Sequence, residues 1–196
     1  MLKKFLFVIL SVVLAACITT PEPVSTPSAE QMDSEERVVY TALLRNLYSA
    51  SSFVIMDTTA TGPVGVEDTA STLDHIVQNM HGVDLETVDN YWVRNEAAYP
   101  VRPDMDIGCG YVLLSQSEMG KIFSQDRDGW QLFYEQYPDA PGIITLSRVS
   151  FNNTLDQALV YVGTISQWLT GAGYYVLLLK GNGQWIVDQQ VMTWIS

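Results

Sequence analysis

The strongest constraint on the fold of this chain lies near its C-terminus, in a strand that has to be covered on both faces. Both the odd and the even positions of residues 174–179 are apolar, which is typical of a central strand in a sheet. Gly181-Asn182-Gly183 follows and predicts a tight hairpin, because Asn-Gly favours the positive φ angles of such a turn. A further strand is expected over residues 185–195. The chain must therefore build a layered sheet around this hairpin.

Other segments extend the sheet and add helices. Residues 143–151 and 158–163 have strand character, and so do the shorter runs 53–56 and 111–114. Helical spacing begins after Asp33 or Ser34, which can cap a helix, and it recurs around residues 73–80, 85–92, 118–123 and 130–137. We therefore expect a single α+β domain over residues 33–196. Its antiparallel sheet should have four to five strands, with helices packed on one side.

The N-terminus carries an export signal. Lys3 and Lys4 precede an apolar run over residues 5–16, which is too short to span a bilayer as a helix. The run ends in Leu14-Ala15-Ala16-Cys17, which resembles the lipobox of bacterial lipoproteins. That resemblance implies a signal peptide over residues 1–16, removed before Cys17, and fatty acyl chains, including palmitate, on Cys17. The alternatives are an ordinary secretory signal and an uncleaved anchor.

Cleavage would change the charge of the chain. The full sequence has 10 basic and 22 acidic residues. Loss of Lys3 and Lys4 leaves 8 basic residues against the same 22, a net charge of −14. This negative charge argues against nucleic acid as a partner. It also provides no electrostatic attraction to anionic lipid, so membrane binding would depend on the acyl chains of Cys17. Residues 17–32 are rich in Pro, Ser and Thr and are expected to form a flexible tether.

The C-terminal half is similar to an uncharacterised family of bacterial exported proteins. The resemblance lies in residues 142–152, 157–163, 173–178 and 183–187, and more loosely upstream. It implies export and carries over no catalytic residue. The closing Gly183-x-Trp185-x-Val187 strand is also similar to those of NTF2-like α+β folds, which bears on fold alone.

Catalytic motifs are sparse. The sequence has no Gly-x-Ser-x-Gly elbow, no phosphate-binding loop and no His-Glu-x-x-His, and no cofactor is expected. A weak calcium candidate comprises Asp126, Asp128 and Glu135, although Ser124 stands where such loops begin with a carboxylate. The alternative for Asp128 is a helix cap.

Two residues are candidates for binding. Arg148 is the only charged residue of an apolar strand, so it needs a carboxylate partner, and Asp57, Asp106 and Asp188 are the candidates. It forms either a structural ion pair or a contact to an anion. Trp168 lies in the loop 164–173 and either folds over the sheet edge or anchors a partner.

These features predict an extracytoplasmic lipoprotein of the bacterial cell envelope, anchored through Cys17. Ile18 after the cysteine favours the outer membrane if the organism has one. The globular domain is expected to bind an envelope protein or a small ligand without catalysis. The alternative is an extracytoplasmic hydrolase that uses acidic residues.

Overall fold

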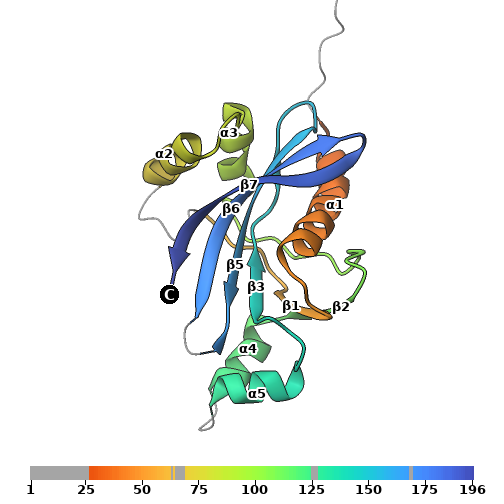
Figure 1. Ribbon diagram of the computed structural model, residues 1–196, viewed down its shortest axis with the longest axis vertical. Helices are drawn as coiled ribbons and strands as arrows, with labels where there is room; N and C mark the ends of the chain where they lie inside the picture. The colour runs from red at the N-terminus through yellow and green to blue at the C-terminus, as the bar shows by residue number, and fades with distance from the viewer. Residues whose placement is uncertain (1–26, 63, 65–68, 125–127, 168–169) are drawn as a thin grey trace, which may run out of the picture.

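The computed structural model describes residues 27–62, 64, 69–124, 128–167 and 170–196. Its centre is a seven-stranded mixed sheet in the order β2-β1-β3-β5-β6-β7, with β4 paired to β5 (Figure 1). The strands are β1 (Ser52–Met56), β2 (Gly110–Leu114), β3 (Ile143–Leu146), β4 (Ser150–Phe151), β5 (Gln157–Ile165), β6 (Gly171–Gly181) and β7 (Gln184–Ile195).

The α+β class is confirmed, but two details of the expected sheet are wrong. The sheet has seven strands instead of four to five, and it is not purely antiparallel, because β1 runs parallel to both β2 and β3. The strand expected over 143–151 is also divided into β3 and β4. Between them the Ser147 hydroxyl accepts from the Tyr161 backbone N–H of β5, and the Arg148 backbone N–H donates to the side chain of Asn95.

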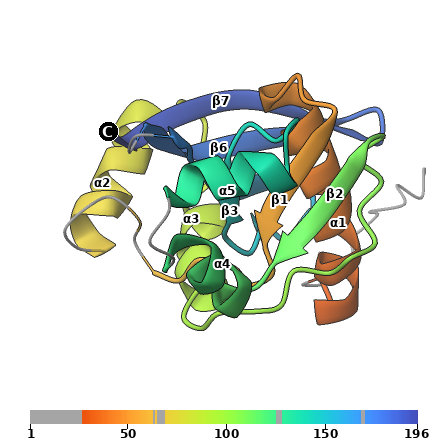
Figure 2. The same ribbon diagram turned by 90° about the horizontal axis from the view of Figure 1, so that it is seen from below.

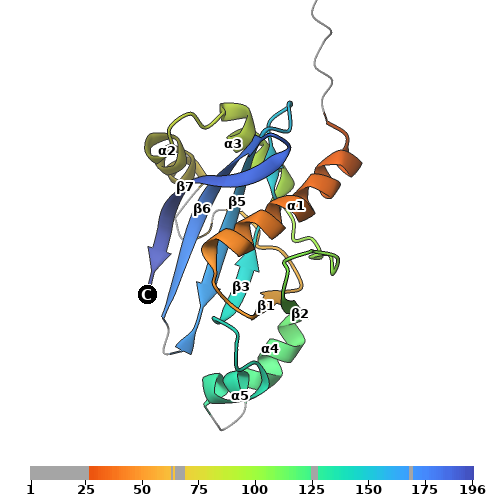
Figure 3. The ribbon, with the colours of Figure 1, turned by 45° about the vertical axis from the view of Figure 1, so that its right-hand side comes forward.

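Helices cover both faces of the sheet, which corrects the expectation of one covered side. α1 (Ala29–Leu47) packs on one face (Figure 3). α2 (Thr69–Asn79) and α3 (Leu85–Arg94) pack on the other face, over Leu159 and Leu177 of the central strands. α4 (Gln116–Phe123) and α5 (Gly129–Gln136) extend this second layer under β1 and β3 (Figure 2).

The alternation in β6 explains why both layers are needed. Val176 and Leu178 point into the core beneath α1, whereas Tyr175 and Leu177 point into the core beneath α2 and α3. All four side chains are at most 1% exposed. A sheet that is apolar on both faces is stable in water only when helices cover each of them.

The hairpin between β6 and β7 is confirmed. Asn182 and Gly183 form its two-residue turn with φ angles of 50° and 78°, the positive pair of a type I′ turn. The strongest local signal in the sequence thus fixes the register of the two longest strands.

α1 begins earlier than expected. Its N-cap is Ser28, whose hydroxyl accepts a hydrogen bond from the Gln31 backbone N–H, while the Gln31 side chain accepts one from the Ser28 N–H. This reciprocal capping box starts the helix at Ala29 instead of after Asp33. Residues 29–32, which the sequence predicts as part of the tether, form the first turn of this helix. None of the helices in the described ranges combines the length and the apolarity that crossing a membrane requires.

Candidate functional site

A hollow lined by charged side chains runs along the outer side of α1. It is lined on one side by the helix and on the other by the segment 102–106, which precedes β2. Two adjoining hollows of about 400 and 340 Å³ share Ser34 and Arg37. We call this surface the charged groove, and its residues are Glu30, Asp33, Ser34, Arg37, Val38, Thr41, Arg45, Arg102, Asp104 and Asp106.

Burial of neighbouring residues positions both walls. On α1, Tyr40, Leu43 and Leu44 are at most 4% exposed and pack against the sheet, so Ser34, Arg37 and Arg45 on the opposite side of the helix line the groove. The opposite wall is held by buried apolar residues that flank its charged ones, namely Val101, Met105 and Ile107. These anchors leave Arg102, Asp104 and Asp106 at the surface.

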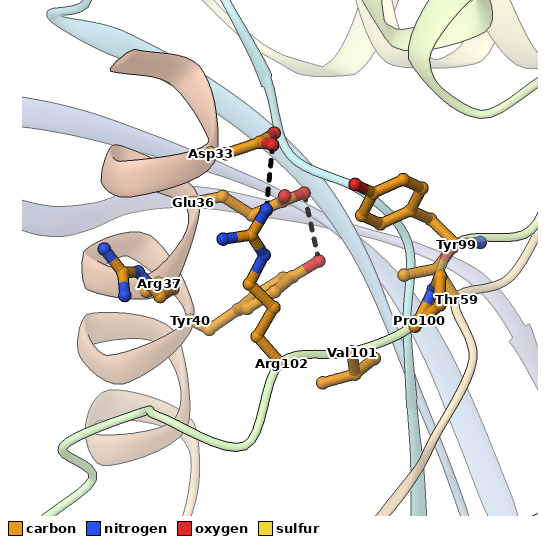
Figure 4. A pocket seen from close by; sticks show the side chains of 9 residues that line it. All are labelled: Asp33, Glu36, Arg37, Tyr40, Thr59, Tyr99, Pro100, Val101 and Arg102. Carbon is orange, nitrogen blue, oxygen red and sulfur yellow. Dashed lines mark hydrogen bonds and ion pairs between the residues drawn. The ribbon is translucent and has the colours of Figure 1, made fainter. Parts of the chain in front are cut away.

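Ion pairs cross the groove between its two walls. Arg37 of α1 pairs with Asp104, and Arg45 lies 3.5 Å from Asp106. In a third pair the arginine lies on the other wall: Arg102 of the segment 102–106 donates to Asp33 of α1 at 3.2 Å (Figure 4). Three positively charged arginines and four negatively charged carboxylates therefore line the groove together.

Beneath the groove lies a second, buried layer of charge. Arg148 pairs with Asp33 and, at 2.9 Å, with Glu36, while Arg94 lies 3.4 and 3.5 Å from the same two carboxylates. The side chains of Arg94, Arg148 and Glu36 are only 9–12% exposed. Within the described residues, every arginine thus belongs to α1 or pairs with its residues.

Glu36 is held by donors on several sides. One oxygen accepts from the Val149 backbone N–H at 2.7 Å, and the carboxylate also accepts from the Arg148 guanidinium. The Tyr40 hydroxyl is a further donor to Glu36 (Figure 4). Burial, followed by the Glu36 charge, raises the pKa of Tyr40 well above its usual value. Burial pulls the pKa of Arg148 down, but Glu36 and Asp33 outweigh it and hold that pKa above its ordinary value. This network fastens α1 to the β3–β4 turn.

Arg148 confirms the expectation that a buried arginine is paired, but the three candidate partners are wrong. Asp57, Asp106 and Asp188 are not among its contacts, and the carboxylates come from Asp33 and Glu36 of α1. The guanidinium carbon also lies 4.0 Å from the centre of the Tyr99 ring. The structural ion pair therefore describes Arg148 better than an open anion contact does.

The other candidates have different outcomes. Asp128 caps α5 by accepting from the Trp130 N–H at 3.0 Å, as the alternative to calcium binding predicted. Glu135 of the same candidate site accepts from Gln131. Cys17, Asp126 and Trp168 lie outside the described residues. Within the described ranges, no three His, Cys, Asp or Glu residues gather closely enough to hold a metal ion.

A second hollow, of about 330 Å³, lies where the C-terminal end of α1 meets β6 and β7. The hydroxyls of Tyr48 and Thr164 form a hydrogen bond in its lining, to which Tyr174 and Gln190 also contribute polar groups. Burial raises the pKa of Tyr48, so this hollow presents a neutral lining in contrast to the charged groove.

The sequence predicts a helix cap at Asp33 or Ser34 and gives no sign of the charge network around this helix. Arg94 and Arg102 of that network lie in other segments. No family model matches the chain, and no match was found among curated proteins or among solved structures.

Proposed function

We propose that this protein is a lipid-anchored, extracytoplasmic lipoprotein whose globular domain binds a ligand in the charged groove. The anchor is proposed from the run Leu14-Ala15-Ala16-Cys17 that follows a basic and apolar leader. The binding role is proposed from the groove, and the observation that carries it is the set of arginine–aspartate pairs that stand open to solvent across it.

The groove has the size and chemistry of a binding site. Its two hollows, of about 400 and 340 Å³, fall within the usual range for small-ligand sites. Arg37 and Arg102 engage their carboxylates through one terminal nitrogen each, whereas a guanidinium has five N–H donors. Donors therefore stay available to a ligand without unfolding any element.

The same geometry favours binding over hydrolysis by paired carboxylates. Asp33 and Glu36 lie together, as a two-carboxylate mechanism would need. Their oxygens, however, already accept from arginines, and Glu36 also accepts from Val149. Protein donors thus already occupy the oxygens that a two-carboxylate mechanism would direct at its substrate.

The anchor is tested on the full chain expressed in a bacterium that is fed radiolabelled palmitate. We expect the wild-type protein to carry the label and to fractionate with membranes. Cys17→Ser should remove the label and either release the protein or leave the uncut precursor. Cys109→Ser is the matched control and should keep both label and membrane. Unlabelled wild-type protein, or Cys17→Ser protein that is processed and stays with lipid, would contradict the anchor.

A further inference from the structure

The charges of the groove indicate the kind of ligand that it accepts. Three arginines and four carboxylates line it, within a chain of net charge −12. A purely anionic ligand would meet the arginines but would be repelled by Asp33 and Asp104 beside them. A ligand that carries an anionic and a cationic group close together matches both signs.

The ion pairs can exchange partners with such a ligand. The side chains of Arg37 and Asp104 are 35% and 50% exposed, and those of Arg45 and Asp106 are 52% and 95% exposed. Ion pairs at this exposure contribute little to stability, so breaking them is inexpensive. An anionic group of the ligand can replace Asp104 as the partner of Arg37. A cationic group of the same ligand can then form an ion pair with the released Asp104 carboxylate.

The chemistry of the two groups narrows the class. A phosphate offers several oxygens to guanidinium forks that approach from different sides, here Arg37 from α1 and Arg102 from the facing segment. A primary ammonium has three N–H donors that can reach the neighbouring carboxylates and the Ser34 hydroxyl. A phosphoethanolamine group combines both and carries no large net charge against the acidic protein.

The position of the groove indicates where this ligand comes from. Glu30 and Ser34 lie within about 9 Å of the Ser28 cap along the helix axis, at the end where the chain enters the domain. The eleven residue steps from Cys17 to Ser28 span at most about 40 Å even when fully extended. An acylated Cys17 would keep the groove close to a surface crowded with headgroups, where weak affinity is enough for occupancy.

We propose that the charged groove binds the phosphoethanolamine headgroup of the membrane that anchors the protein, with Arg37 and Arg102 on the phosphate and Asp104 on the ammonium. The choice of a lipid headgroup rests on the proposed anchor. The phosphoethanolamine chemistry rests on the groove alone, and the two parts are tested separately.

The first experiment uses the mature, acylated protein in a non-ionic detergent at constant ionic strength. NMR signals of the arginine Nε–H groups are followed while O-phosphoethanolamine, phosphocholine, glycerol phosphate or ethylamine is added. We expect saturable shifts of the Arg37 and Arg102 signals with phosphoethanolamine, and at least fivefold weaker binding of the other three compounds. Equal binding of glycerol phosphate would overturn the paired-charge site in favour of a simple anion site, and no saturable shift would overturn the site altogether.

Variants test the assignment of the groups. Arg37→Gln and Arg102→Gln should each weaken phosphoethanolamine binding at least fivefold with little effect on the melting temperature. Lys121→Gln removes the same charge from α4, at a distance from the groove, and should leave binding within twofold. Asp104→Asn should abolish the preference for phosphoethanolamine over glycerol phosphate. Equal weakening by Lys121→Gln would overturn the site, because it would mean that only net charge matters.

A second experiment tests the lipid source. The acylated protein is reconstituted into vesicles of phosphatidylcholine alone or with one third phosphatidylethanolamine, and amide hydrogen exchange is measured. Slower exchange in the first half of α1 and in residues 102–106, only with phosphatidylethanolamine and only with Arg102 intact, supports the proposal. Binding of free phosphoethanolamine without this protection would overturn the lipid source and assign the groove to a soluble ligand. Mass spectrometry of Cys17 shows independently whether the anchor itself fails.

Discussion

Glu36 and Arg148 are 112 positions apart in the sequence and meet in one buried pair, with Nη2 of Arg148 2.9 Å and Nε 3.4 Å from the two oxygens of Glu36. The pair joins the second turn of α1 to the break between β3 and β4. Because Glu36 also accepts from the Val149 N–H, it satisfies a backbone donor that leaves the sheet at this point. The pair therefore fixes where the helix that forms one wall of the groove sits on the sheet.

Arg148→Met should lower the free energy of unfolding by about 3 kcal/mol, because removing one partner of a buried pair leaves the other charge uncompensated. Adding Glu36→Gln removes that charge while keeping an acceptor for Val149, so the double variant should recover part of the loss. Urea unfolding of the two single variants and the double variant measures both effects. A loss below about 1 kcal/mol for Arg148→Met would show that Arg94 alone suffices to balance Glu36.

Gly173→Ala should destabilise the protein by about 2 kcal/mol through overpacking. A Cβ atom at this position would lie 2.1 Å from Nε1 of Trp194 and 2.6 Å from the Tyr161 hydroxyl. These two groups hydrogen bond to each other at 2.8 Å and have little room to move. Gly181→Ala, at the end of the same strand, is the control, because its Cβ would meet nothing within 4 Å. Thermal unfolding of both variants distinguishes a packing effect from a general loss of glycine in β6.

Much of the sheet could be predicted because its signals are local. The alternation in residues 174–179 and the turn at Asn182-Gly183 need only neighbouring residues to be interpreted, and β5, β6 and β7 formed as expected. The parallel pairing of β1 with β2 and β3 was missed. That pairing joins segments about 60 to 90 positions apart. It cannot be predicted from short apolar runs, because their sequence does not specify which other strand they pair with.

The site was harder to predict for the same reason. The sequence shows that Arg148 needs a carboxylate, but it does not show which of 22 acids is near. The expected cap at Asp33 or Ser34 is wrong, although Ser28-x-x-Gln31 has the spacing of a capping box and marks the true start of the helix. With that start, Asp33 and Glu36 fall inside the helix, one turn apart, where they can face a common partner.

Ser28→Ala should cost about 1 kcal/mol by removing the acceptor for the Gln31 N–H. The effect should be local, with faster amide hydrogen exchange in the first turn of α1. Ser34→Ala is the matched control, since this exposed serine lies inside the helix, where alanine is favourable. Unchanged exchange at residues 29–32 in Ser28→Ala would contradict the capping box as the start of the domain.

The last prediction concerns alkaline pH. Burial raises the pKa of Tyr161 to about 12 and raises that of Tyr91 well above its usual value of 10. Between pH 10 and 12 the unfolded chain loses these protons while the folded protein keeps them, so rising pH favours unfolding. Stability should therefore be complete below pH 10 and fall steadily above it.

The midpoint of urea unfolding, measured from pH 9 to 12 together with tyrosinate absorbance, checks this prediction. Tyr161→Phe should lower stability at pH 9, because the Trp194 N–H loses its acceptor. The same variant should flatten the decline above pH 10, because one of the groups that resists ionisation is gone. A midpoint that stays constant up to pH 11.5 would show that these hydroxyl groups titrate alike in the folded and unfolded chains.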